Sequence, residues 1–269
     1  MYLTRCGSGE PILFIHGMPT NGRLWNKIIE RLCGRYTCFT VDLPGLGKTP
    51  RAQYGPEYLR KLAEQIEALR LQNGIVKWHV VGHDAGSAVA VHYAHFFQPQ
   101  VDCMVLLSPA LFPELEPYFL IEPLRTPVLG EVLAPVVQAL FWKIAMRRAI
   151  GDEPSGAEMV NEFHAPFTGP AGPWRFMKLM RWGKPSQLLA QVPAFLPQLL
   201  MPTLIFQGSH DAAIPESFAR RAASLLPNAG MVMLDSGHFI PLHQPESVAS
   251  SLVRFFETRS PQMSEDFTT

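Results

Sequence analysis

The sequence has no excess of charge of either sign. Lys and Arg together number 23, Asp and Glu together number 23, and the isoelectric point is about 7.1. A chain of this balance has no overall basic field that would hold nucleic acid or anionic lipid. We therefore expect no nucleic-acid partner, no membrane partner, and a small apolar substrate.

Long apolar runs are also missing. No stretch reaches the roughly 18 uninterrupted apolar residues of a membrane span, and residues 1–10 lack the apolar core of a signal peptide. We expect a cytoplasmic protein, either a monomer or a homodimer. At 269 residues and 47% hydrophobic content, the chain is long enough for one large domain with an inserted lid.

Cysteines are few and show no paired spacing of the kind that metal ligands have. In a cytosolic chain such cysteines are expected to be reduced thiols. Some of the nine histidines are neighbours in the sequence, but none of these has a second pair of possible metal ligands close to it in the sequence. We therefore expect no metal and no organic cofactor. The cysteines are Cys6, Cys33, Cys38 and Cys103.

Short apolar runs rich in β-branched and aromatic residues alternate with stretches of helical spacing. This alternation predicts an α/β protein with a doubly wound, mainly parallel sheet. An antiparallel edge strand is expected at 2–6, before the turn-like residues 7–9. The other expected strands are 11–15, 36–41, 78–81, 101–107, 203–206 and 231–234, and the expected helices are 24–32, 57–71, 85–97 and 217–226.

The alternation stops between about Ala110 and Met201, where Pro, Trp, Met and Leu accumulate. Helical spacing at 129–148, 157–164 and 174–180 predicts an inserted helical cap over the C-terminal edge of the sheet. We assign 1–110 and 201–258 to the core, 111–200 to the cap, and 259–269 to a flexible tail, because the chain becomes polar there.

Asp84 lies in the sequence Gly82-His83-Asp84-Ala85-Gly86, between an expected strand and an expected helix. Two flanking glycines fit the tight strand-to-helix turn that exposes a nucleophile. An aspartate with an ordinary pKa of about 3.9 is already an anion at neutral pH, and its natural target is a saturated carbon with a leaving group. Alternatively, Asp84 is an ordinary helix N-cap.

Three further segments follow expected strands and would lie at the same edge of the sheet. They are His16–Pro19, Gly208–Asp211 and Ser236–Phe239. The order nucleophile, acid, histidine predicts Asp84, Asp211 and His238 as a catalytic set. Asp235 is an alternative acid, although it is only three residues from His238. Taken singly, Asp211 is also compatible with a loop acid and His238 with a loop histidine.

These segments resemble the α/β-hydrolase superfamily over about residues 2–256. Within it, residues 16–25, Asp42–Gly47 and Gly82–Gly86 resemble the epoxide hydrolase and haloalkane dehalogenase group, which has an aspartate nucleophile. The resemblance implies an ester formed on Asp84 and hydrolysed by water that His238 activates. It also implies an oxyanion hole made by the backbone N–H groups of Met18 and Ala85.

The residues that stabilise the leaving group depart from both subgroups. Haloalkane dehalogenases have Trp where this chain has Ala85, and epoxide hydrolases use a pair of lid tyrosines where this chain has only Tyr118. We favour epoxide hydrolysis, for which one lid donor can suffice, with dehalogenation as the alternative. Non-hydrolytic binding or biosynthetic use of the pocket stays open. The cap candidates, each of which could instead serve packing, are Tyr118, Trp142, His164, Trp174 and Trp182.

Overall fold

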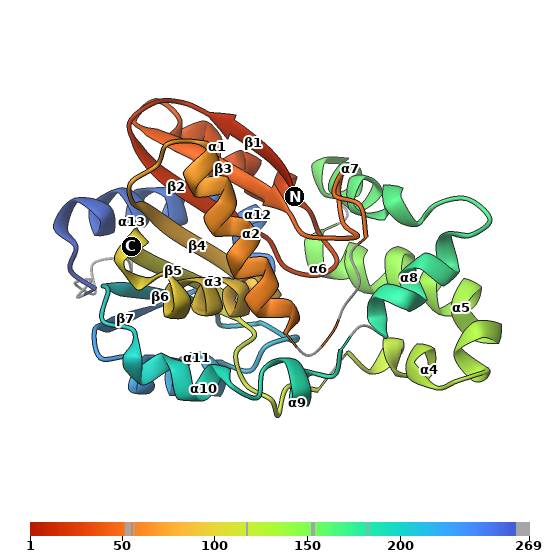
Figure 1. Cartoon of the computed structure of the whole chain (residues 1–269). Helices are drawn as coiled ribbons and strands as arrows, with labels where there is room; N and C mark the ends of the chain where they lie inside the picture. The colour runs from red at the N-terminus through yellow and green to blue at the C-terminus, as the bar shows by residue number, and fades with distance from the viewer. Residues whose placement is uncertain (52–54, 56, 117, 152–153, 182, 262–269) are drawn as a thin grey trace.

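Seven strands form one sheet in the computed structural model, which describes residues 1–51, 55, 57–116, 118–151, 154–181 and 183–261 (Figure 1). The strand order is β1-β3-β2-β4-β5-β6-β7. β1 pairs antiparallel with β3, with Tyr2 opposite Asp42, and all other pairs are parallel. The strands are β1 (Tyr2–Cys6), β2 (Glu10–Ile15), β3 (Tyr36–Asp42), β4 (Trp78–Asp84), β5 (Val101–Pro109), β6 (Thr203–Gly208) and β7 (Ala229–Leu234).

Helices cover the central strands, and these strands are buried on both faces for that reason. Every residue of β3 and β6 is buried. α2 and α3 pack side by side, α1 packs against α13, and α11 packs on β6 and β7. The core helices are η1 (Gly22–Trp25), α1 (Asn26–Leu32), α2 (Tyr58–Gln72), α3 (Ala85–Phe96), η2 (Gln98–Gln100), α11 (Glu216–Leu225), α12 (Ile240–His243) and α13 (Pro245–Thr258). The doubly wound, mainly parallel sheet predicted from the sequence is confirmed.

The cap is the helical lobe to the right of the sheet in Figure 1. Its long helix is continuous from α5 through the π-helical turn η4 into α6, and α8 packs along α5. The elements of the lobe are η3 (Phe119–Ile121), α4 (Glu122–Arg125), α5 (Leu129–Leu140), η4 (Phe141–Met146), α6 (Arg147–Ile150), α7 (Pro154–His164), η5 (Ala165–Phe167) and α8 (Gly172–Met180).

The last helices of the insertion lie on the core instead of on this lobe. α10 packs against α3, and the ring of Phe195 stacks on His95 with 3.8 Å between ring centroids. The chain therefore returns to the sheet before residue 200, the limit expected for the cap. These returning elements are α9 (Pro185–Leu188), α10 (Val192–Phe195) and η6 (Leu196–Gln198).

Two arginines tie α4 to α8 reciprocally. Arg125 in α4 donates to the carbonyls of Met180 and Gly183 at the end of α8, at 2.9 and 2.8 Å. Arg181, just after α8, donates to the carbonyls of Leu124 and Thr126 at the end of α4. Each guanidinium thus satisfies carbonyls that a helix C-terminus leaves unpaired.

Part of the segment expected as a flexible tail contacts the core. Arg259 pairs with Asp102 at 2.7 Å, and a Cβ on Gly230 would overlap the carbonyl of Pro261. Residues 262–269 lie outside the described part of the chain. The four cysteines are free thiols.

Candidate active site

Asp84 occupies a strained turn at the junction of β4 and α3. Its backbone φ is 50°, in the left-handed region that non-glycine residues rarely adopt. A Cβ on Gly82 would lie 2.7 Å from the Gly86 carbonyl, and one on Gly86 would lie 2.3 Å from the Ile15 carbonyl. Both glycines are therefore needed for the close approach that this turn requires.

The carboxylate of Asp84 lies against two backbone amides. Met18 N–H donates to Oδ2 at 2.8 Å, and the amide of Ala85 also acts to lower the pKa of the carboxylate. These are the two amides expected to form the oxyanion hole. Gly17 makes the approach possible, because a Cβ there would lie 2.5 Å from Asp84 Oδ2.

Two buried side chains behind the Met18 loop fix its shape. His16 Nε2 accepts the Leu43 N–H at 2.9 Å, so the proton is on Nδ1, which donates to the Gly17 carbonyl at 2.8 Å. Burial lowers the pKa of His16 to about 4 and keeps the ring neutral. Asp42 accepts the amides of Gly22 and Lys48, both at 2.8 Å. Both segments stand out in the sequence, but these supporting roles of His16 and Asp42 were not predicted from it.

His238 and Asp211 form a hydrogen-bonded pair, with 3.0 Å between Nδ1 and Oδ2. The other oxygen of Asp211 accepts the amides of Ala213 and Ile214. The alternative acid, Asp235, instead pairs with His210 at 3.0 Å. Asp211 is therefore the acid that orients the imidazole in this structure.

The pKa values of the three groups reflect burial opposed by charge. Burial raises the pKa of Asp84, and the charge of His238 and the two backbone amides oppose that rise without cancelling it. Burial lowers the pKa of His238, but the hydrogen bond and charge of Asp211, with the charge of Asp84, outweigh it and raise the pKa above 6.5. For Asp211, burial is outweighed by His238, and the pKa falls to about 2.

Two residues that were not predicted from the sequence hold the loop of His238. His83 Nε2 lies 2.9 Å from the backbone carbonyl of His238, and Ser108 Oγ donates to the same carbonyl at 3.4 Å. Ser108 has φ 42° at the end of β5 and is completely buried. The sequence signal for His83 is its position directly before Asp84.

A cavity of about 670 Å³ lies between the cap and the C-terminal ends of the strands. Asp84, Ala85 and His238 contribute to its wall, and most of the remaining wall is apolar, as in typical small-molecule sites. Apolar wall residues come from both the core and the cap, including Leu59, Val89, Phe141 and Leu179.

The cap residues expected as candidates to stabilise the leaving group lie in different places. Tyr118 lines the cavity, whereas Trp142, His164 and Trp174 are not among the described lining residues. The Trp142 ring stacks on His164 with 5.0 Å between centroids, His164 Nε2 lies 3.0 Å from Gln138 Nε2, and Trp174 Nε1 donates to the Glu131 carbonyl. These three residues pack the cap, and Trp182 lies outside the described residues.

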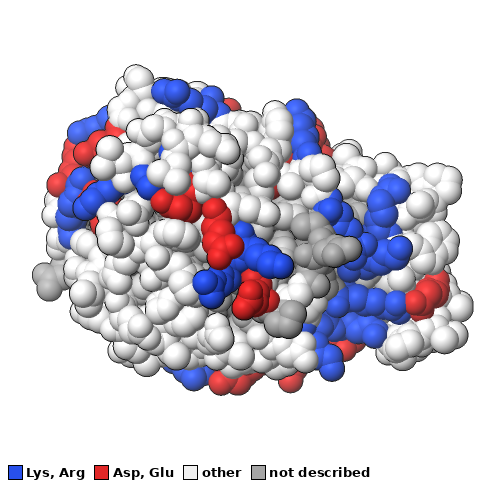
Figure 2. All heavy atoms as spheres, viewed as in Figure 1, with Lys and Arg blue, Asp and Glu red and all other residues white. Residues whose placement is uncertain are grey.

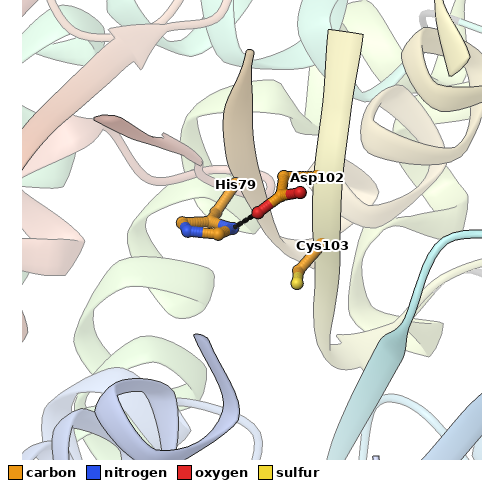
Figure 3. A group of neighbouring side chains, drawn as sticks. All are labelled: His79, Asp102 and Cys103. Carbon is orange, nitrogen blue, oxygen red and sulfur yellow. Dashed lines mark ion pairs between the residues drawn. The ribbon is translucent and has the colours of Figure 1, made fainter. Parts of the chain in front are cut away.

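A second cluster of polar side chains lies near the start of β4 and β5. His79, Asp102 and Cys103 have ligand-type atoms within 4.8 Å of one another (Figure 3). However, Arg259 already pairs with Asp102 at 2.7 Å, and burial raises the pKa of the Cys103 thiol to about 12, which disfavours the thiolate that binds metal. The cluster fits an ionic network that fastens the end of α13 better than a metal site.

Comparisons with known proteins agree with this architecture. The pimeloyl-[acyl-carrier protein] methyl ester esterase of Vibrio vulnificus is 27% identical over 255 residues, covering 93% of this chain and 95% of that protein. A 2-hydroxy-6-oxo-6-(2'-aminophenyl)hexa-2,4-dienoic acid hydrolase of Metapseudomonas resinovorans is 22% identical, covering 94% and 86%.

A similar fold is found among solved structures. The haloalkane dehalogenase DbeA of Bradyrhizobium elkani has a TM-score of 0.80 and 22% identity, covering 96% of this chain and 94% of that one. The sequence also matches the Alpha/beta hydrolase family over residues 12–251. With that match over most of its length, the chain belongs to the Alpha/beta hydrolase family.

Proposed function

We propose that the protein hydrolyses a small apolar substrate through a covalent ester on Asp84. The observation that carries this proposal is the Asp84 carboxylate at the elbow, bonded to the Met18 amide and next to the Ala85 amide, in a cavity that it shares with His238. An ionised carboxylate attacks a saturated carbon and displaces the leaving group without prior activation.

The second step uses the paired histidine and acid. His238 takes a proton from water, and the resulting hydroxide attacks the ester carbonyl carbon of Asp84. The tetrahedral oxyanion is stabilised by the Met18 and Ala85 amides, and its collapse releases the product alcohol and restores the carboxylate. Asp211 holds the imidazole in place and stabilises its protonated form.

For the leaving group we propose the oxygen of an epoxide. Attack by Asp84 breaks one ring C–O bond, and the released oxygen takes a proton from a cap donor, for which we propose Tyr118. The described cavity wall contains no tryptophan, and alanine follows the nucleophile. Halide displacement, the alternative, therefore lacks an indole donor at Ala85, although the fold resembles haloalkane dehalogenases.

Ester hydrolysis of the serine type has less support in the site. The nearest serine on the helix, Ser87, is buried, and its hydroxyl donates to the Gly82 carbonyl at 3.1 Å. Attack by the Asp84 carboxylate on an acyl carbon would give a high-energy anhydride. The remaining alternative is binding or biosynthetic chemistry without hydrolysis, which needs no covalent ester.

The test is to trap the ester. The His238→Gln variant, incubated with panels of epoxides and haloalkanes, should gain a mass adduct on the peptide containing Asp84, because alkylation proceeds and hydrolysis stops. An epoxide adduct retains the oxygen as a hydroxyl, whereas a haloalkane adduct forms with release of free halide. Asp84→Asn in the same background is the control and should give no adduct.

Tyr118→Phe then tests the proposed acid. It should slow turnover of epoxides and leave substrate binding in place. If wild-type protein turns over no member of the panels and His238→Gln forms no adduct, although the cavity binds the same compounds, the hydrolytic mechanism is wrong.

A further inference from the structure

The outer face of the long cap helix is apolar and exposed. The run Leu129–Ile150 has the length and hydropathy of a membrane span. However, only 39% of its most apolar 18-residue stretch is buried. Val132 is 70% exposed and Val136 is 58% exposed. Further along the same run, Leu140 and Ile144 repeat this spacing of four residues, which keeps the side chains on one broad face. A core helix would have these side chains buried.

The inner face of this helix is already occupied by the cap. Gly130, Ala134, Val137 and Phe141 are buried, and Gln138 donates to the carbonyl of Phe167. Because one face packs against protein, the helix cannot be surrounded by lipid. The arrangement fits a helix that lies in the plane of a lipid–water interface, with its apolar face toward the lipid.

Cations accompany the apolar residues on the exposed face. Lys143, Arg147 and Arg148 are exposed, and none has an ion pair within the described part of the chain. The one acid between residues 129 and 150 is Glu131, and its charge is paired with Arg181. The exposed face therefore has a local positive charge that the neutral total for the chain does not reveal.

The backbone just before this helix supplies a separate observation. Val128 has φ 66°, which a β-branched residue adopts only under strain, and its side chain is 76% exposed. Four residues before Val132, it extends the apolar row by another position. Trp174, which donates to the Glu131 carbonyl, is also half-exposed, and such an amphipathic ring suits a lipid–water boundary.

The apolar face continues to the opening of the cavity. Ile144 and Tyr118 are both exposed and both line the cavity, so they lie at its mouth. In the view of Figure 2, the outer edge of the cap is largely uncharged, and Lys and Arg side chains gather between that edge and the core. The apolar face of the helix and the mouth of the cavity are therefore adjacent, with cations nearby. A partner that binds to this face would lie next to the cavity mouth.

We infer that the outer face of α5–α6 docks on an anionic lipid surface. The cations meet the lipid phosphates, the apolar row enters the boundary between headgroups and acyl chains, and the cavity mouth is held near that boundary. A second copy of the chain fits less well, because a two-fold contact through this face would bring two sets of the unpaired cations Lys143, Arg147 and Arg148 into one interface. This inference does not depend on which bond Asp84 attacks.

The proposal is tested by flotation of the full chain with vesicles. We expect binding to phosphatidylcholine vesicles containing about one third phosphatidylglycerol, and little binding to phosphatidylcholine alone. Binding should weaken as salt is raised, because the attraction to lipid phosphates is screened.

Two variants separate the apolar and the charged contributions. Val132→Glu with Val136→Glu should abolish flotation, whereas Val76→Glu, at a valine 81% exposed and far from the cap in the fold, should not. Lys143→Gln with Arg147→Gln should weaken binding roughly fivefold for each cation removed, whereas Lys77→Gln should not. Thermal unfolding of each variant checks that its fold is intact.

Three results would overturn the proposal. The first is no flotation of the wild type with anionic vesicles. The second is flotation that the double glutamate variant leaves unchanged. The third is a dimer in light scattering that Val132→Glu with Val136→Glu converts to monomer while wild-type dimer shows no lipid binding, which would make the face an interface between copies.

Discussion

The His83 ring donates its Nε2 hydrogen to the backbone carbonyl of His238, across 2.9 Å. A carbonyl only accepts, so the proton is on Nε2, and Nδ1 is left buried without a partner in the described structure. Burial lowers the pKa of His83 to about 3, and the ring stays neutral through the working pH range. The residue before Asp84 thus positions the loop of His238.

His83→Phe should lower kcat/KM about 10- to 100-fold, because a shift of about 1 Å in His238 is enough for such a loss. The catalytic side chains themselves are unchanged, so the ester on Asp84 should still form. His92→Phe is the matched control, since His92 is also buried, bonds a backbone carbonyl, that of Ala88, and is not among the described residues that line the cavity. Equal losses of activity in both variants would argue for a general packing effect.

Gly17→Ala should slow hydrolysis of the ester on Asp84 by about 100-fold or more. The new Cβ would lie 2.5 Å from Asp84 Oδ2 and would push the Met18 amide away from the carboxylate; removal of one oxyanion donor typically costs about that factor. Single-turnover kinetics with an accepted substrate measures the step. Gly34→Ala, where a Cβ would meet nothing within 4 Å, should leave the rate unchanged.

The rate of ester hydrolysis should fall as pH decreases through the pKa of His238. His238 acts as a base only when neutral, and the hydrogen bond and charge of Asp211 raise its pKa against burial; the charge of Asp84, which also raises it in the free protein, is lost in the ester. In Asp211→Asn that stabilisation of the imidazolium is lost, so the acid limb should move to lower pH while the maximal rate drops. A pH profile of single-turnover hydrolysis tests this, and an unmoved acid limb would show that His238 does not set it.

Arg181→Met should loosen the junction of α4 and α8. Arg181 donates to the Leu124 and Thr126 carbonyls, and the substitution leaves both without that partner. Hydrogen exchange at the amides of residues 122–131 and 172–181 should then accelerate about tenfold or more, ahead of the core strands. Arg220→Met, which removes only an exposed pair with Glu216, is the control and should change neither region.

The sequence determined the architecture and the residue at the tight turn between β4 and α3. Apolar runs of strand length alternate with helical spacing because a parallel sheet must be buried on both faces, and that pattern places the seven strands without any long-range information. Gly82, Gly86 and the order of Asp84, Asp211 and His238 are likewise local signals, since turn geometry restricts residue type at each position.

Tertiary structure alone decided which distant groups meet. Spacing along the chain left Asp211 and Asp235 as alternatives, and the fold brought Asp211 to His238 while Asp235 paired with His210. It also placed Tyr118 on the cavity and Trp142 in the packing of the cap, because an amphipathic helix sequence does not state which partner its apolar face meets. The exposed face of α5 could not be predicted from the sequence for the same reason. Hydropathy measures how apolar a segment is, and only the packing shows which of its apolar side chains are exposed.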